Sequence, residues 1–315
     1  MPRLPRLQFP HAIYHVYNRG NYRTYVFDEP GAAEAFLLCL FQAAKLFGWK
    51  VHGYVVMGNH FHLALETPRA NLVEGMHWLL STYATRFNRF RREQGHLFQG
   101  VYRAKLVEPG RYLGNLVNYI HLNPVRAGIC AIGALPCYRW SSLRRFLEHP
   151  RPEFLTCAEW LREQNLQDTP EDWRQYRDIL AAIASDPARQ EAGGFDSMTL
   201  GWAIGSKEWK REMAAEFDLR GAVEPMSGPE RDALRAELWH RELDAALVRL
   251  GRTRADLASD RKGAPWKVTL ADELRRSANC SCAWLAQELA MGGAAALRTR
   301  LHEHRKSLRS TPPDA

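Results

Sequence analysis

The stretch VHGYVVMGNHFHLALE, residues 51–66, decides the fold of this 315-residue chain. It contains most of two β-rich runs, Lys50 to Val56 and His60 to Glu66, with Met57-Gly58-Asn59 between them. A short break with Gly-Asn between two such runs is typical of an antiparallel hairpin. We therefore expect an antiparallel hairpin here, flanked by the segments that precede and follow it in the chain.

Strand and helix patterns alternate on both sides of the hairpin. In chain order, the flanking segments are a strand at His11–Tyr17, a helix over 29–47, a helix over 71–93, a strand over 101–108 and a helix over 110–123. We expect Pro124 to stop the last helix, because proline lacks the N–H that a helix interior uses. The order β-α-β-β-α-β-α predicts an α+β domain with a ferredoxin-like split βαβ antiparallel sheet.

The sequence becomes mostly helical after residue 150, which predicts a helical C-terminal extension. We divide the chain into an α+β domain at 1–150, an acidic helical connector at 151–228 and a helical region at 229–315. Residues 221–229 have the composition of a linker. Short helices around Gly292-Gly293, with basic flanks, resemble a helix-turn-helix unit that could bind DNA.

The formal net charge of +8 is unevenly distributed along the chain. Residues 1–150 carry a net charge of +10, residues 151–260 carry −7 and residues 261–310 carry +6. Nine of the twelve histidines also lie in the first 150 residues. Basic blocks on both sides of an acidic middle predict a polyanionic partner for the two ends of the chain.

Composition excludes several classes of protein. A hydrophobic content of 46%, with 11% aromatic residues, is enough for a packed core and excludes a wholly disordered chain. No apolar run reaches the roughly 20 residues that cross a bilayer, and no signal-peptide pattern is present. Six cysteines without a CxxC pair argue against a disulfide framework and a zinc ribbon. We expect a soluble, cytoplasmic protein with no membrane partner, and the sequence leaves monomer and homodimer open.

The sharpest local motif is His60-Phe61-His62. Alternate residues of a strand share one face, so both imidazoles should point the same way and Phe61 should pack on the other side. Neutral imidazole is a common ligand of divalent metals. Taken alone, the motif is also compatible with two half-exposed histidines on a hairpin strand.

A second motif, Asn118-Tyr119-Ile120-His121-Leu122-Asn123-Pro124, lies in the last helix of the α+β domain. Tyr119 and Asn123 are four residues apart and project from one helix face. The amide oxygen of Asn123 is a hard ligand suited to magnesium or manganese. A phenol beside such a metal could attack a phosphate and form a covalent link. Taken alone, the motif is also compatible with a purely structural role, as a helix end with a packed tyrosine.

Together with these motifs, an ordered set of segments resembles the HUH single-tyrosine transposases, and within them the REP-associated tyrosine transposases. The segments are HVYNRGN (15–21), VVMGNHFHLALE (55–66), NLVEGM (71–76), YATRFN (83–88), HLFQGVYRAKLVE (96–108), YIHLNPVRAG (119–128) and YRWSS (138–142). The resemblance covers residues 8–146. Val101 and Gly58 depart from the usual family pattern, and neither touches the proposed chemistry.

The resemblance implies a role for each motif residue. His60 and His62 would hold magnesium or manganese, Asn123 would be the third ligand and Tyr119 the nucleophile. Tyr119 would become linked to the 5′ end of single-stranded DNA, release a 3′-OH and later reverse the step. Relatives recognise short imperfect hairpins, so hairpin DNA is the implied substrate. Tyr112 competes with Tyr119 as nucleophile, but it has Leu116 in place of an asparagine at +4.

Cationic side chains with interleaved aromatic rings predict the contacts with DNA. Such a mixture suits single-stranded nucleic acid, because phosphates pair with arginine and bases stack on rings. For some of these side chains the alternative to DNA binding is an ordinary one, in which the cations form a solvated helix face and the aromatic rings belong to the core. The candidate residues are Arg19, Arg23, Arg86, Arg89, Arg91, Arg92, Arg103 and Lys105.

Three functions are compatible with these residues. The favoured function is metal-dependent cleavage and rejoining of single-stranded DNA at hairpins, as in a transposase. The second is a domesticated regulator that binds hairpin DNA with little or no cleavage, although a pure binder has no need of His60, His62, Tyr119 and Asn123. A zinc hydrolase is less favoured, because no third His, Cys or carboxylate stands at a suitable local spacing from the histidine pair.

Overall fold

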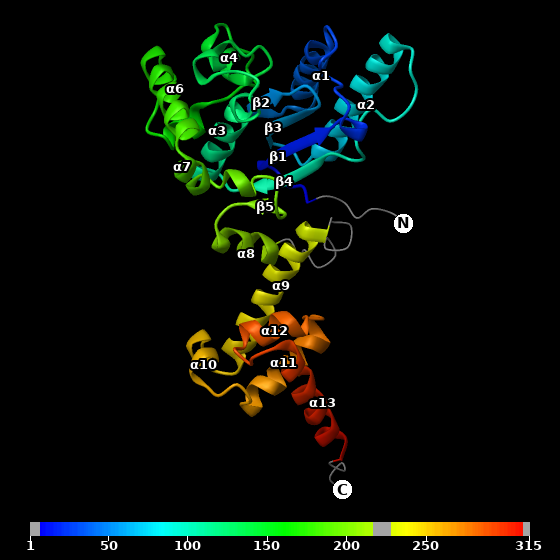
Figure 1. Ribbon diagram of the computed structural model, residues 1–315, viewed down its shortest axis with the longest axis vertical. Helices are drawn as coiled ribbons and strands as arrows, with labels where there is room; N and C mark the ends of the chain where they lie inside the picture. The colour runs from blue at the N-terminus through cyan, green and yellow to red at the C-terminus, as the bar shows by residue number, and fades with distance from the viewer. Residues whose placement is uncertain (1–6, 217–227, 311–315) are drawn as a thin grey trace. The chain divides into compact units, whose positions relative to one another are not determined.

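The computed structural model describes residues 7–216 and 228–310 of the chain, drawn as ribbon in Figure 1. Within this part the chain forms two compact units. Of the described residues, 7–210 and 228–231 belong to the first unit, and 211–216 and 232–310 to the second. None of the described helices is long and apolar enough to span a bilayer.

A five-stranded sheet forms the centre of the first unit as the structure describes it. Its strands are β1 (Ala12–Arg19), β2 (Lys50–Val56), β3 (His60–Thr67), β4 (Arg103–Val107) and the short β5 (Ala203–Ile204). The order across the sheet is β2-β3-β1-β4-β5. The first four strands pair antiparallel, as the ferredoxin-like prediction requires, while β5 adds a parallel edge to β4.

Helices cover both faces of this sheet (Figure 1). On one face, α1 (Ala32–Phe47) and α2 (Leu72–Arg91) pack on each other, and Phe36 of α1 lies 4.7 Å from Phe61 between ring centroids. On the other face, α3 (Arg111–Arg126) packs against β2 and β3. Successive side chains of a strand point to opposite faces of the sheet. Phe61 of β3 therefore enters the core on the first face, while His60 and His62 point to the face of α3.

The predicted end of the last helix at Pro124 is wrong. Pro124 lies inside α3, which continues to Arg126. The turn after the helix supplies its final hydrogen bonds, because the backbone N–H of Ala127 donates to Asn123 and that of Ile129 donates to Pro124. A proline late in a helix is tolerated where packing holds the chain. The longer helix places Arg126 two turns after Tyr119, on the same side.

Residues 130–210 complete the first unit. Their elements are η2 (Ile132–Cys137), α4 (Ser142–Leu147), α5 (Ala158–Arg162), α6 (Pro170–Ser185), α7 (Pro187–Ala192) and η3 (Phe195–Ser197), while η1 (Asn21–Arg23) follows β1. Both α5 and α6 pack on α3. The buried His121 of α3 bonds with the Tyr176 hydroxyl and with the Ser142 hydroxyl, each at 2.8 Å. Much of the acidic stretch predicted as a connector therefore lies in the same unit as the sheet.

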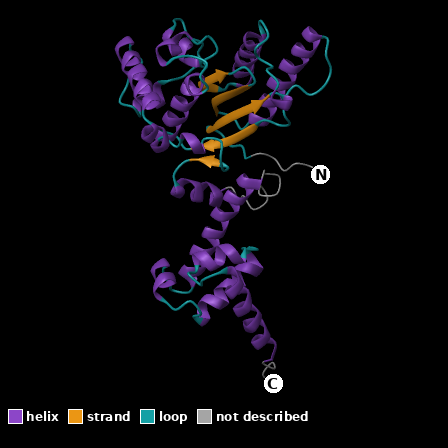
Figure 2. Cartoon of the chain, in the orientation of Figure 1, coloured by secondary structure: helices purple, strands orange, loops and turns teal. Residues whose placement is uncertain are grey.

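Every element of the second unit in the described residues is a helix (Figure 2). Most of α8 (Lys207–Glu216) belongs to it, with most of α9 (Gly228–Arg249), then α10 (Arg254–Ser259), α11 (Pro265–Ser277), α12 (Cys282–Glu288) and α13 (Ala294–Ser310). Leucines of α9, α11, α12 and α13 share one buried core, which includes Leu243, Leu274, Leu285 and Leu297. The linker predicted over 221–229 lies mostly outside the described residues.

Candidate functional site

Tyr119 and the two histidines of the HxH motif lie together on the α3 face of the sheet. The ring centroids of His60 and His62 are 5.2 Å apart, and that of His62 is 5.5 Å from that of Tyr119. His62 and Tyr119 are buried, while His60 is partly exposed at the start of β3. The structure therefore brings Tyr119 to a histidine pair that lies 57 and 59 positions earlier in the sequence.

A chain of hydrogen bonds through His15 on β1 determines the tautomer of His62. The Nδ1 atom of His15 lies 3.0 Å from the carbonyl oxygen of Met198, which can only accept, so His15 Nδ1 carries the proton. The Nε2 atom of this neutral ring is then an acceptor, 2.9 Å from His62 Nδ1. His62 therefore donates through Nδ1 and keeps a bare lone pair on Nε2.

His60 has the same tautomer for a different reason. Its Nδ1 donates to the side-chain oxygen of Asn59 at 2.7 Å, which leaves Nε2 as the lone-pair nitrogen. Burial, helped by the charge of Arg19, lowers the pKa of His60 to about 4. Burial also lowers the pKa of His62 well below its ordinary value and that of His15 to about 3. All three rings are neutral at pH 7.

The pair fits a divalent metal ion by the chemistry of its donor atoms. Metal-binding histidines commonly give their second ring nitrogen to a fixed acceptor, which orients the ring and sets the tautomer. Asn59 and His15 act in this way for His60 and His62. Among the described residues, neither Nε2 atom has a hydrogen-bond partner in the structure.

Asn123, the expected third ligand, is buried one turn after Tyr119. Its side-chain nitrogen donates to the Tyr119 carbonyl oxygen at 2.9 Å, so the amide is held against the helix that carries the tyrosine. Its contact with Tyr119 links it to the site. Its role as a metal ligand stays a prediction.

The Tyr119 ring is enclosed by an aromatic and a cationic side chain. Phe195 of η3 lies 5.5 Å away edge to face, and the Arg126 guanidinium lies 5.2 Å from the ring centroid. Burial raises the pKa of Tyr119, while the Arg126 charge and hydrogen bonds with Asn123 and Arg126 lower it and offset part of that effect. Arg126 is thus placed to stabilise negative charge on the phenol oxygen.

The cationic side chains predicted to contact DNA differ in burial and in their contacts within the protein. Lys105 is wholly buried and its ammonium group donates to the Gly201 carbonyl oxygen, so the prediction of a surface contact by Lys105 is not supported by its burial. Arg91 pairs with Glu29 and Glu93, and Arg86 contacts Gln42. All of the predicted arginines are exposed, namely Arg19, Arg23, Arg86, Arg89, Arg91, Arg92 and Arg103.

The sequence reasoning missed exposed rings beside the histidine pair. Tyr22 in η1 is 91% exposed and Tyr25 is 64% exposed. Their segment contacts the turn before β3, because the side chain of Asn59 donates to the Arg23 carbonyl oxygen at 3.3 Å. A tyrosine among the arginines after β1 was the available signal, since such rings stack on bases.

Three further residues near Tyr119 were also missed, each for a different reason. His15 occurs in a β1 stretch whose alternation places Ile13, His15 and Tyr17 on one face, and this was a usable signal. Arg126 was hidden by the wrong helix end. Phe195 comes from a segment 76 positions after Tyr119 and carries no local signal.

A second group of potential metal ligands lies elsewhere in the unit. The side-chain ligand atoms of His52, Glu66 and Glu159 lie within 4.8 Å of one another. Glu66 is already paired with Lys50 at 2.9 Å and with His11 at 3.2 Å. This group does not include the HxH pair, and its Glu66 carboxylate already pairs with groups of the protein.

Comparison with known proteins gives one family model and several similar solved structures. Residues 8–123 match the family model described as Transposase IS200 like. One similar solved structure, titled as a REP-associated tyrosine transposase bound to a REP hairpin, is 13% identical, with a TM-score of 0.39 over 49% of this chain and 90% of that one. A putative transposase from Deinococcus radiodurans R1 is 20% identical, with a TM-score of 0.28 over 41% of this chain and 92% of that one. No curated protein matches the chain.

Proposed function

We propose that the chain, whose residues 8–123 match the family model described as Transposase IS200 like, cleaves and rejoins single-stranded DNA with Tyr119 as nucleophile. The observation that carries the proposal is the position of the buried Tyr119 phenol beside the neutral pair His60 and His62. Arg126, over the same ring, supplies the positive charge that an attacking phenol oxygen needs.

In the cleavage step, the Tyr119 oxygen forms a bond to the scissile phosphorus and its proton passes to solvent. The bond from phosphorus to the 3′ oxygen breaks, and that oxygen takes up a proton and leaves as a hydroxyl. The product is a 5′-phosphotyrosine, and attack by a 3′-OH reverses the step. Because burial raises the pKa of Tyr119, Arg126 contributes by favouring the charged form of the phenol.

We propose His60 and His62 as the protein ligands of a magnesium or manganese ion, with Asn123 as the third. When bound, such an ion acts as a Lewis acid on the scissile phosphate. The contribution of the protein is to hold the ligands in one tautomer. Asn59 does this for His60, and His15 does it for His62.

We propose folded, hairpin-forming single-stranded DNA as the substrate. The support comes from exposed Arg19 and Arg23, which flank the highly exposed Tyr22 close to the turn that carries His60. Arginines can hold phosphates while a tyrosine stacks on an unpaired base. Arg89, Arg92 and Arg103 are further candidates for phosphate contacts.

An adduct assay tests this function. The full chain is incubated with 3′-labelled hairpin DNA and manganese, because the 5′-phosphotyrosine keeps the 3′ part of the strand, and a covalent product is sought on a denaturing gel. We expect an adduct with the wild type and with Tyr112→Phe, and none with Tyr119→Phe. An adduct that survives in Tyr119→Phe would exclude this nucleophile. Hairpin binding without an adduct, across varied hairpins, would instead support a DNA-binding regulator.

A further inference from the structure

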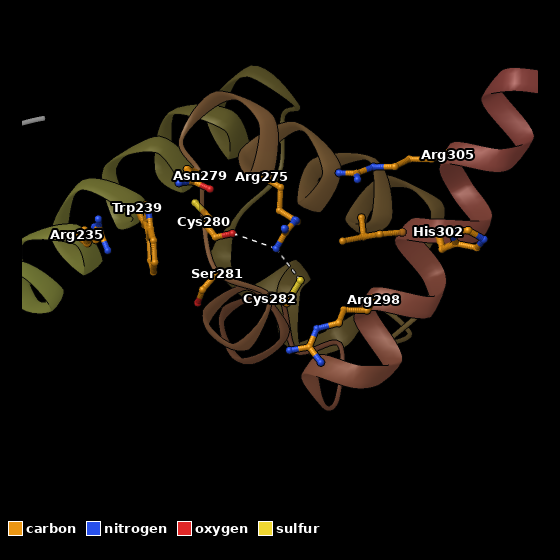
Figure 3. Close-up of a pocket in the computed structure, with 11 residues that line it drawn as sticks. Arg235, Trp239, Arg275, Asn279, Cys280, Ser281, Cys282, Arg298, His302 and Arg305 are labelled. Carbon is orange, nitrogen blue, oxygen red and sulfur yellow. Dashed lines mark hydrogen bonds between the residues drawn. The ribbon is translucent and has the colours of Figure 1, made fainter.

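The second unit contains a basic pocket that the proposed cleavage does not use. Its volume is about 610 Å³, and it lies between α9, the loop before α12 and α13 (Figure 3). The charged and ionisable side chains that line it are Arg235, Arg275, Arg298, His302 and Arg305. No described carboxylate lines the pocket, so its walls carry positive charge alone.

The charge of this pocket is only partly neutralised by the protein. Arg275 donates to the Cys280 carbonyl oxygen at 3.5 Å and to the Cys282 sulfur at 2.7 Å, two neutral groups (Figure 3). Arg298 and Arg235 have no carboxylate within 4 Å in the described part of the chain. Unpaired cations in a partly enclosed site attract an anion strongly, because solvent screens them less than on an open surface.

One of the arginines, Arg305, does have an acidic partner. Its Nε atom lies 2.6 Å from a carboxylate oxygen of Asp272, which also pairs with Arg276 at 3.2 Å. The Asp272 side chain is only 3% exposed, and its negative charge is neutralised inside the unit by its ion pairs with two arginines. An anion in the pocket would therefore meet Arg235, Arg275 and Arg298 first.

The pocket borders a helix-turn-helix arrangement. Helix α12 and helix α13 pack on each other through buried Leu285, Leu289 and Leu297, and the turn between them contains Gly292 with a φ of 90°. A glycine is required there because other side chains are strained at this φ. The outer side of α13 exposes Arg298, Thr299, His302 and Arg305. Two helices joined by a glycine turn, the second with an exposed polar face, are typical of units that enter the major groove.

We propose that the second unit binds duplex DNA, with α13 in the major groove and the pocket around Arg298, Arg235 and Arg275 on a backbone phosphate. A single strand is a poorer ligand here, because single-strand sites use exposed rings for stacking. The described residues of the second unit expose no large aromatic side chain, and Trp239 in the pocket donates its indole N–H to the Ala278 carbonyl oxygen at 3.0 Å. This site goes beyond the proposed cleavage, because it is a separate attachment to DNA.

Fluorescence anisotropy on the full chain tests the proposal. The probe is a fully paired duplex of about 20 base pairs without hairpin potential, in a buffer with a chelator, titrated at several salt concentrations. Arg298→Glu and Arg235→Glu are compared with Arg261→Glu, an exposed charge reversal in the same unit that lies outside the pocket. Circular dichroism confirms that each variant is folded.

We expect the two pocket variants each to weaken duplex binding about 10-fold or more and to lower the salt slope by about one or more, since one phosphate contact contributes about 0.9. Arg261→Glu should stay within about twofold of the wild type, as a charge away from the DNA contacts does. Equal losses in all three variants would show a general charge effect and overturn the assignment, as would tighter binding of the matching single strand. Competition by polyglutamate as strong as by DNA would point instead to an acidic protein partner and would also overturn it.

The two proposals fail separately. Arg298→Glu should still form the covalent adduct on a short hairpin at the wild-type rate, because Tyr119 lies in the first unit. Tyr119→Phe should bind the paired duplex as the wild type does. Loss of the adduct with intact duplex binding would contradict only the proposed cleavage.

Discussion

Replacement of His15 by phenylalanine is the most direct test of the tautomer chain. The variant keeps a ring of similar size and removes both ring nitrogens. The His62 N–H would lose its acceptor at 2.9 Å and the Met198 carbonyl its donor at 3.0 Å. Because His15 is wholly buried and His62 nearly so, water cannot readily replace these partners.

The size of the effect of His15→Phe can be given for two quantities, the free energy of unfolding and the affinity for manganese. A buried polar group left without a partner costs about 1–3 kcal/mol, so His15→Phe should lower the free energy of unfolding by that order. Loss of the partner that orients a metal-binding histidine costs about 10–100-fold in metal affinity, or about 1.4–2.7 kcal/mol. The affinity for manganese should fall by this factor in the same variant.

Manganese binding is measured by the electron paramagnetic resonance signal of the free ion, and stability by urea unfolding. His121→Phe is the matched control, because His121 is also wholly buried with two hydrogen bonds but lies away from the HxH pair. We expect the control to lose stability and to retain manganese affinity. Wild-type manganese affinity in His15→Phe, or an equal loss in His121→Phe, would refute the reasoning.

Three further predictions follow from the first unit. Arg126→Gln should slow adduct formation about 10-fold or more in a single-turnover gel assay, because the phenol oxygen loses its nearby positive charge, while hairpin affinity changes little. Tyr22→Ala should weaken binding of single-stranded DNA by about 1–3 kcal/mol in anisotropy titrations and leave duplex binding unchanged. For Glu66, burial raises the pKa, but hydrogen bonds from His52, Lys50 and His11 outweigh it and hold the value at about 2. Its stabilising effect is present above the ordinary pKa and is lost as pH falls toward 2, so urea unfolding of Glu66→Gln should show about 2 kcal/mol less stability at pH 7 and a flatter decline in acid.

Local periodicity was enough to predict the elements around the hairpin. The strands β2 and β3, with Gly58-Asn59 between them, follow from β-rich runs and a turn signal within the 18 residues from Lys50 to Thr67. The shared face of His60 and His62 follows from the two-residue repeat of a strand. The spacing of Tyr119 and Asn123 similarly follows from the helical repeat. These features depend only on neighbours in sequence, so they could be predicted from the sequence alone.

The continuation of α3 and the burial of Lys105 could not be predicted in the same way. Pro124 is a local signal for a helix end, and packing of α3 against the sheet overrides it. Lysine is usually exposed, yet Lys105 is covered by the segment that carries Gly201. In both cases a contact distant in sequence outweighs a local preference.

By itself, then, the sequence determined the ferredoxin-like order of elements, the histidine pair and the tyrosine on the second helix after it. Only the tertiary structure decided the tautomers of the two histidines and the surroundings of the Tyr119 ring. The pairing of β1 with β3 brings His15 to His62, and residues near position 195 close over Tyr119. Register and long-range packing set such contacts, because they are fixed by the burial of whole faces and not by the residues adjacent in the chain.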